Sequence, residues 1–151
     1  MNKNKPIILL DPYPRTMDLL FSKENLNYLK KNFKLITAPN KNKNNFYEKN
    51  LPSADYIFGQ PNLPSSLISK STKLKAIFNV ESNFMDNMDY DYCFRKGIHV
   101  LATSPVFAQP VAEMAIGLTL SIARSIHIAH SDFISKKEKY GGAISQNNFL
   151  I

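Results

Sequence analysis

Few side chains in this sequence have the chemistry of catalysts or metal ligands. Its 151 residues include three histidines, His99, His127 and His130, and one cysteine, Cys93. Their spacing is not that of zinc ligands, so we expect no metal site, and a single cysteine cannot form an internal disulfide. We expect His99 to lie in a strand, and His127 and His130 at the surface end of a helix, so that none serves as a catalytic base.

Backbone chemistry is more promising in the turn formed by Val80, Glu81, Ser82, Asn83 and Phe84. This turn follows an apolar run at residues 74–80 that predicts a strand. A predicted helix at residues 88–96 comes next and ends at Gly97. Unpaired N–H groups between a strand end and a helix start stabilise an anion. The turn is therefore either an ordinary connection between a strand and a helix or a site for an anion.

Strands and helices alternate around this turn. Further strands are predicted at residues 7–10, 34–37, 54–59 and 98–101, one helix from Thr16 to about Phe33, and a short helix after Pro64. The asparagine- and lysine-rich segment 40–45 is predicted to be a solvated loop. Such alternation implies right-handed crossovers, and it predicts a flavodoxin-like α/β domain over residues 1–104, with a parallel sheet and helices on both faces.

A long helix predicted at residues 109–126 differs from the others, because apolar residues occupy nearly its whole circumference. A helix of this kind has to be covered. Glu113 and Arg124 bound an uncharged run of ten residues, whereas a membrane span needs about twenty. We therefore predict an inter-domain helix within a second segment, residues 105–151, that packs on another domain or a second subunit rather than in the core of the first domain.

In this order and at this spacing, the segments resemble the D-isomer-specific 2-hydroxyacid dehydrogenase family. The resemblance covers residues 54–126. The stretches that carry it are Ala54-Asp55-Tyr56-Ile57, Leu74-Lys75-Ala76-Ile77, Asp86-Asn87-Met88-Asp89, Arg95-Lys96-Gly97-Ile98-His99-Val100, Val111-Ala112-Glu113 and residues 118–124.

The resemblance implies an activity and a set of contacts. In this family the backbone of the turn at residues 80–84 would hold the carboxylate of a small 2-hydroxy or 2-keto acid, and Asn83 and Val111 match positions near an NAD or NADP cofactor. The family's catalytic Arg, Glu and His belong to a nucleotide-binding domain that would begin after Ile151. We therefore expect the N-terminal part of an NAD(P)-dependent D-2-hydroxyacid dehydrogenase, a fragment with no catalytic residue and no activity alone.

Three features depart from the family pattern. Phe84 stands where a glycine is usual, and its side chain is expected to narrow the site. Glu81 places a negative charge beside the expected carboxylate, so it must point away, be paired, or indicate a different substrate. The glycines, at positions 59, 97, 117, 141 and 142, form no Gly-x-Gly-x-x-Gly dinucleotide motif.

Two alternative functions were weighed against the dehydrogenase. The first is a stand-alone module that binds a small carboxylate, or associates with itself, without catalysis. The second is a response-regulator receiver, which shares the fold class but needs a cluster of acidic residues after the first strand and an aspartate after the third. Asp11 stands alone after the first strand and Gly59 ends the third, so the receiver is disfavoured.

Charge and targeting patterns bound the partners. The formal net charge is +7, but the lysines lack the interleaved aromatic residues of nucleic-acid modules, so we expect no nucleic-acid partner. The apolar run at residues 7–10 is too short for a secretory signal. We therefore expect a cytoplasmic protein that makes no membrane contact and forms a homodimer through residues 109–126.

Overall fold

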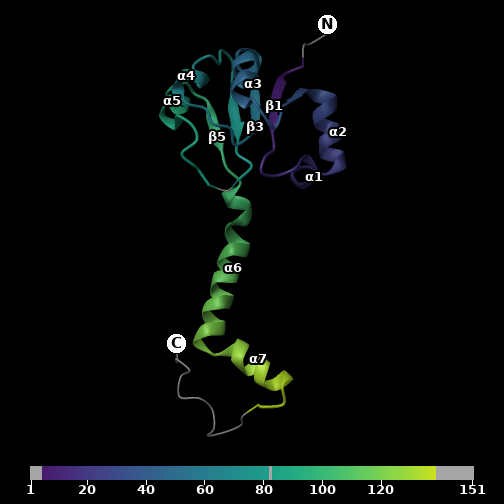
Figure 1. Cartoon of the computed structure of the whole chain (residues 1–151), viewed down its shortest axis with the longest axis vertical. Coiled ribbons are helices and arrows are strands. Elements are labelled where there is room, and N and C mark those ends of the chain that lie inside the picture. The colour runs from purple at the N-terminus through teal and green to yellow at the C-terminus, as the bar shows by residue number, and fades with distance from the viewer. Residues whose placement is uncertain (1–4, 82, 139–151) are drawn as a thin grey trace. The chain divides into compact units, whose positions relative to one another are not determined.

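A computed structural model of the chain describes residues 5–81 and 83–138. The chain divides into two compact units, Met1–Ser104 and Pro105–Ile151. The elements in chain order (Figure 1) are β1 (Ile7–Asp11), α1 (Met17–Leu20), α2 (Lys23–Asn32), β2 (Lys34–Thr37), α3 (Lys43–Asn50), η1 (Leu51–Ser53), β3 (Tyr56–Gly59), α4 (Ser65–Ile68), β4 (Ala76–Phe78), α5 (Tyr90–Arg95), β5 (His99–Leu101), α6 (Ser104–Ala123) and α7 (Ile126–Ile134).

The first unit is built on one five-stranded sheet with the order β2-β1-β3-β4-β5, and each pair of neighbouring strands is parallel. In the register, Leu9 lies opposite Ile36 on one side and Ile57 on the other. This arrangement confirms the predicted flavodoxin-like α/β fold. All strands end at the same edge of a parallel sheet, so the loops that follow β1, β3, β4 and β5 gather there.

One face of the sheet carries the main core. Leu9, Ile57, Ile77 and Val100 point to this face, where they pack against buried residues of α3, η1, α4 and α5. The buried partners from these helices are Tyr47, Leu51, Leu67, Ile68 and Cys93. Burial of each large apolar side chain contributes about 1.5–3 kcal/mol relative to its exposed state. The predicted strands form because their apolar runs are covered in this way.

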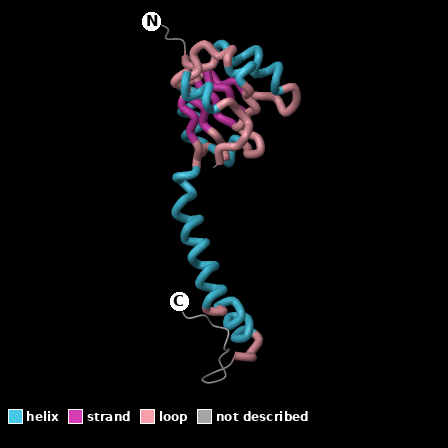
Figure 2. Tube along the Cα trace, turned by 90° about the vertical axis from the view of Figure 1, so that its left-hand side faces the viewer, coloured by secondary structure: helices cyan, strands magenta, loops and turns pink. Residues whose placement is uncertain are grey.

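The opposite face is rich in aromatic rings. Phe58 stacks on Phe78 with a centroid distance of 4.5 Å, and Phe21, which precedes α2, meets Phe58 edge-on at 5.4 Å. Phe33, directly after α2, meets Tyr56 edge-on at 6.1 Å. Helices therefore lie on both faces of the sheet, as predicted, and Figure 2 shows the strands enclosed between them.

The single helix predicted from Thr16 to Phe33 is wrong, because the structure has two helices in this segment. Phe21 is extended and closes α1, and Ser22 then caps α2 by accepting a hydrogen bond from the Asn25 N–H at 3.2 Å. Serine at this position satisfies an N–H that has no partner within the helix. The capping serine thus starts a new helix within a continuous apolar pattern.

The solvated loop predicted at residues 40–45 is also wrong in part, because α3 begins at Lys43. Asn42 adopts a left-handed conformation, with φ of 60°, and starts the helix. Asparagine is one of the few side chains that tolerate this conformation. The helix buries only Tyr47, so its sequence carries almost no apolar periodicity.

The second unit contains α6 and α7. The predicted start of the long helix at Gln109 is wrong, because α6 begins at Ser104 and runs through Pro110. Proline suits the first turn of a helix, which explains the late start that the sequence suggested. Ser125, with φ of 52°, separates α6 from α7. His127 therefore lies in the first turn of α7 and His130 in its middle, and the predicted position at a helix C-terminus is wrong.

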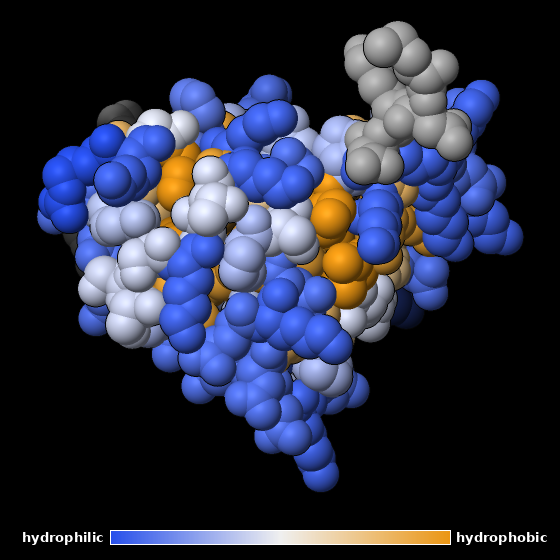
Figure 3. Space-filling model, turned by 90° about the horizontal axis from the view of Figure 1, so that it is seen from above, coloured by the Kyte–Doolittle hydropathy of each residue, from blue (hydrophilic) through white to orange (hydrophobic). Residues whose placement is uncertain are grey.

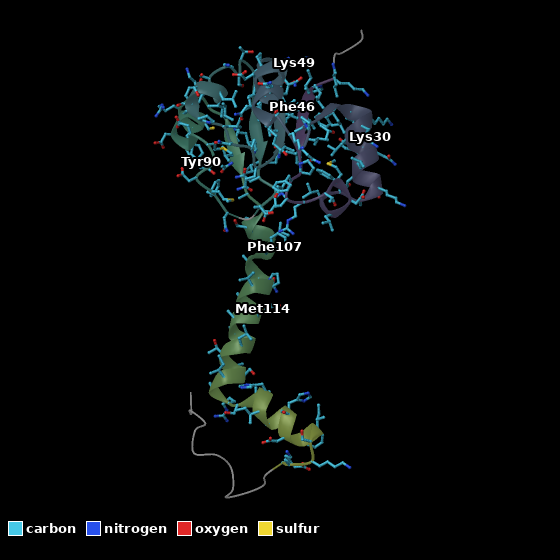
Figure 4. The ribbon with its side chains drawn as sticks, viewed as in Figure 1. Lys30, Phe46, Lys49, Tyr90, Phe107 and Met114 are labelled. Carbon is cyan, nitrogen blue, oxygen red and sulfur yellow. The ribbon has the colours of Figure 1, made fainter. Side chains whose placement is uncertain are left out.

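No residue of α6 is buried. Figure 4 shows the side chains of Phe107 and Met114 projecting from this helix. The large apolar side chains exposed on it are Val106, Phe107, Val111, Met114, Ile116, Leu118, Leu120 and Ile122. By length and composition alone, α6 could cross a membrane, although core helices of soluble proteins pass the same test. The absence of membrane contact therefore stays a prediction.

Candidate functional site

Loops from three strands meet at the carboxyl edge of the sheet. The β4–α5 loop, residues 79–89, contains the predicted anion-binding turn, and side chains from the loops after β1 and β3 hold it in place. Of the five predicted contact residues, Ser82 lies outside the described residues, and the other four lie in this loop.

Glu81 is paired with an arginine from the loop after β1. The Glu81 carboxylate accepts two hydrogen bonds from the Arg15 guanidinium, at 2.9 Å from Nε and 3.2 Å from Nη2. The carboxylate raises the pKa of Arg15, through the hydrogen bond first and its charge second. Glu81 was expected to point away, be paired or indicate another substrate, and the structure shows that it is paired.

Gln60, directly after β3, joins the turn at two points. Its Oε1 accepts a hydrogen bond from the Glu81 N–H at 3.1 Å, and its Nε2 donates to the Asn83 carbonyl at 3.0 Å. The Glu81 N–H is thus already engaged. The N–H groups of Asn83 and Phe84 donate to no acceptor within residues 5–81 and 83–138. These two N–H groups are therefore candidates to bind an anion.

Phe84 turns toward the start of α5. Its side chain is 59% exposed and meets the ring of Tyr90 edge-on, with the centroids 5.5 Å apart. The Tyr90 hydroxyl donates to the Met85 carbonyl at 2.6 Å and lies 3.0 Å from Asn87 Oδ1. Burial raises the pKa of Tyr90. Tyr90, which is labelled in Figure 4, therefore fixes the second half of the loop.

A small apolar cavity lies beside the loop, with a volume of about 180 Å³. Val80 lines it together with Phe58, Phe78 and Leu101. Asn79, also in its lining, is only 2% exposed, and neither side-chain amide atom has a hydrogen-bond partner among residues 5–81 and 83–138. A buried amide without a partner costs about 1–3 kcal/mol. Asn79 could not be predicted as a site residue, because one asparagine at the end of a strand carries no distinctive pattern in the sequence.

A second polar cluster at this edge was also missed. Asp11, the last residue of β1, is 3% exposed, and its carboxylate accepts hydrogen bonds from Lys43 Nζ at 2.6 Å and the Tyr47 hydroxyl at 3.0 Å. Burial, followed by the charge of Asp11, raises the pKa of Tyr47. Gly59 packs against Asp11, whose Cβ would lie 2.9 Å from a Cβ at position 59. The cluster fixes the point where the loop after β1 begins.

The other candidate residues belong to other elements of the chain. Val111 is 63% exposed and belongs to the second unit. His99 is exposed on β5, and His127 Nδ1 lies 3.3 Å from the Ser121 hydroxyl in the second unit. Within the described ranges, no three His, Cys, Asp or Glu side chains lie close enough to hold a metal ion.

A larger hollow than the cavity beside the β4–α5 loop lies at the opposite edge of the sheet, where the strands begin. Its volume is about 780 Å³, and its lining includes Lys5, Lys34, Lys73 and Lys75 together with Asp55. Viewed from this end, the surface is largely hydrophilic (Figure 3). Asp55 accepts a hydrogen bond from the Ile7 N–H at 2.9 Å, so its carboxylate serves the fold. This hollow is remote from the loops that carry the predicted turn.

The described glycines do not fit a dinucleotide site. The space beside Gly59 is occupied by Asp11. Gly97 has a φ of 69° and follows α5, and Gly117 lies within α6. None of them forms a turn in which backbone could approach a pyrophosphate. Gly141 and Gly142 lie outside the described residues.

Comparison with known proteins decides the family. Residues 15–147 match the sequence profile of the D-isomer specific 2-hydroxyacid dehydrogenase catalytic domain. The chain belongs to this family. The family's members are oxidoreductases, as the resemblance of the motifs implied. No curated protein sequence matches the chain.

Solved structures of the family agree in fold. A phosphoglycerate oxidoreductase from Rhizobium etli is 37% identical, with a TM-score of 0.80 over 97% of this chain and 46% of its own. A glyoxylate/hydroxypyruvate reductase from Sinorhizobium meliloti, in complex with NADP and malonate, is 20% identical, with a TM-score of 0.58 over 95% of this chain and 44% of its own. A D-lactate dehydrogenase from Aquifex aeolicus, complexed with NAD and lactic acid, is 23% identical, with a TM-score of 0.51 over 92% and 40%. The chain thus spans less than half of the length of each.

Proposed function

We propose that this chain is the substrate-binding half of an NAD(P)-dependent D-2-hydroxyacid dehydrogenase, which interconverts a small 2-hydroxy acid and the corresponding 2-keto acid. The observation that carries the proposal is the hydrogen bonding of the β4–α5 loop, in a chain that belongs to this family. Gln60 and Arg15 fix the loop, while the N–H groups of Asn83 and Phe84 donate to no acceptor in the part of the chain that the structure describes. Two fixed donors of this kind suit a carboxylate.

Glu81 does not oppose this role, because Arg15 neutralises its charge. The side chain of Phe84 lies against Tyr90, and the substrate carboxylate would meet the backbone of Phe84 rather than its ring. We assign carboxylate binding to the turn at residues 80–84, with Asn83 and Phe84 as the principal donors.

The cofactor of the whole enzyme would be NAD or NADP, which the Sinorhizobium and Aquifex relatives contain in their crystals. The described glycines of this chain do not fit it. We therefore assign the main dinucleotide site, together with the family's catalytic Arg, Glu and His, to a nucleotide-binding domain beyond residue 151. Asn83 and Val111 would contribute contacts from this chain, and the chain alone would be inactive.

The assembly would be a cytoplasmic homodimer. The exposed apolar residues of α6 support this part of the proposal, because monomeric soluble proteins rarely expose contiguous apolar patches of more than a few hundred Å². We propose neither a nucleic-acid partner nor a membrane partner.

Binding and turnover can be separated in one set of experiments. NMR titration of the 151-residue chain with pyruvate or D-lactate should shift the backbone N–H resonances of Asn83 and Phe84 and leave that of Lys34, at the opposite edge, unchanged. An assay with NADH or NADPH and pyruvate should show no turnover. Turnover at enzymatic rates would contradict the division of the site, and an absence of shifts in the loop would contradict carboxylate binding. The alternative, a stand-alone module, would be favoured by two results together. The chain would bind the acid as a stable, soluble dimer, and longer versions of the protein would show no dehydrogenase activity.

A further inference from the structure

The Arg15 side chain is held in place at the carboxyl edge of the sheet. It leaves the loop between β1 and α1 and pairs with Glu81, 66 residues later in the chain. A guanidinium has five N–H donors in a fixed plane, and the pair with Glu81 engages those on Nε and one on Nη2. The remaining donors belong to a side chain that is 52% exposed. Arg15 is therefore oriented by one anion and is able to bind another.

The neighbouring cation at this edge is already committed. Lys43 Nζ lies 2.6 Å from the buried carboxylate of Asp11 and 5.1 Å from the centre of the Tyr13 ring. Replacing this contact with a solvent-facing ligand would leave the Asp11 carboxylate buried without its charge partner, which is costly. Lys43 is thus a poor choice for a ligand, whereas Arg15 can accept one without breaking its existing bonds.

Arg15 is connected to the carboxylate-binding turn through hydrogen bonds. Arg15 holds Glu81, the Glu81 N–H donates to Gln60, and Gln60 donates to the carbonyl of Asn83. The guanidinium therefore stands beside the same turn whose free N–H groups would receive the substrate carboxylate. A ligand whose carboxylate is bound by the turn would therefore have a cation available on the side chain that pairs with Glu81 of the same turn.

We propose that Arg15 determines specificity by binding a second anionic group at the distal end of the substrate, a carboxylate or a phosphate. The inference rests on the proposed function, and it names the substrate class as 2-hydroxy acids that carry two anionic groups. Glu81 is a positioning residue: it orients the guanidinium, whose planar donors match both carboxylate and phosphate.

The test compares binding of three probes to the 151-residue chain by NMR titration: D-lactate, D-malate and D-3-phosphoglycerate. The wild-type chain should bind D-malate or D-3-phosphoglycerate at least tenfold more tightly than D-lactate, and the Arg15 Nε–H resonance should shift with these probes only. The comparison between D-malate and D-3-phosphoglycerate distinguishes a distal carboxylate from a distal phosphate.

Arg15→Gln alone leaves the Glu81 carboxylate without its partner, and this unpaired negative charge would repel every probe. The deciding variant is therefore Arg15→Gln/Glu81→Gln, which removes both charges. It should lose the preference for a doubly anionic probe over D-lactate, a ratio of affinities that support of the loop alone would leave unchanged. The matched control is Lys70→Gln/Glu48→Gln, which removes an exposed ion pair with a similar separation of 2.8 Å, formed between α3 and the residues after α4. This control should retain the preference.

The outcomes separate the two proposals. If the wild-type chain binds none of the probes at the turn, carboxylate binding fails and the specificity role fails with it. If the chain binds all three probes equally, carboxylate binding stands and the role of Arg15 is refuted. Equal weakening of all three probes in the double variant, with an unchanged circular dichroism spectrum, would also refute it, because Arg15 would then only support the loop. Glu81→Gln alone should bind all probes at least as tightly and discriminate less.

Discussion

Removal of the Tyr47 hydroxyl should destabilise the fold by an amount that the structure allows us to estimate. Tyr47 is 1% exposed, and its hydroxyl donates at 3.0 Å to a carboxylate of Asp11 that is 3% exposed. Tyr47→Phe retains the buried ring but leaves Asp11 Oδ2 without this donor. A hydrogen bond to a charged group contributes about 1.5–3 kcal/mol.

The expected loss at neutral pH is therefore about 2 kcal/mol, which lowers Tm by on the order of 10 °C for a domain of this size. Urea unfolding followed by circular dichroism at 222 nm measures the free energy of unfolding directly. Tyr28→Phe is the matched control, because Tyr28 is 65% exposed and loss of its hydroxyl should change the free energy by less than about 0.5 kcal/mol.

Alkaline pH provides a second, independent comparison. Burial raises the pKa of Tyr47 in the folded chain above the ordinary value of 10.0. Tyr47 therefore contributes its full stability below pH 10, and the contribution falls as pH rises, because the unfolded chain releases the proton that the folded chain retains. The difference between wild type and Tyr47→Phe should narrow by about 1.4 kcal/mol per pH unit above pH 10. A Tyr47→Phe protein as stable as wild type at pH 7, or a difference that stays constant to pH 11, would refute the reasoning.

Three further perturbations test other parts of the structure. Gly59→Ala should lower the free energy of unfolding by about 2–3 kcal/mol, because the new Cβ would overlap the Asp11 carbonyl oxygen. Urea titration measures the change. An unchanged midpoint would show that β1 and β3 can separate there without cost. Cys93 is fully buried, and burial raises the pKa of its thiol. Ellman's reagent at pH 8 should therefore react at least 100-fold more slowly with the folded chain than with the chain unfolded in urea. Rapid labelling of the folded chain would mean that α5 detaches readily. The α6 variant Met114→Lys/Leu118→Lys should shift the chain from dimer toward monomer in sedimentation experiments without changing the melting of the first unit, and a dimer that persists would place the contact elsewhere.

The sheet could be predicted from the sequence because its signals are local. Each strand is a short apolar run between polar residues, and their alternation with helices restricts the connections to one hand. The place of the turn at residues 80–84 could also be predicted, since the turn follows directly from where β4 ends; its role in binding an anion stays a prediction. The residues that break or cap helices were harder to place, as Ser22 shows, because a capping serine and an ordinary surface serine look alike in one sequence.

The contacts that build the site were beyond local reasoning. Glu81 was identified as a charge that needed an explanation, but its partner Arg15 lies on another loop and carries no pattern of its own. Lys43 looked like one of several lysines in a solvated segment, yet it belongs to a helix that brings it to Asp11. In both cases the partners are set by the order of the strands, which places residues distant in sequence at one edge.

The clamp between Arg15 and Glu81 also bears on how the first unit folds. Closing a chain over 66 residues costs more entropy than the local turns that join neighbouring elements. The clamp can form only after β1, β3 and β4 have paired, and folding dominated by such distant pairings is slow. The proposed recognition surface is therefore one of the last parts of this unit to assemble, and a nascent chain that ends after β3 still lacks the β4–α5 loop on which the proposal depends.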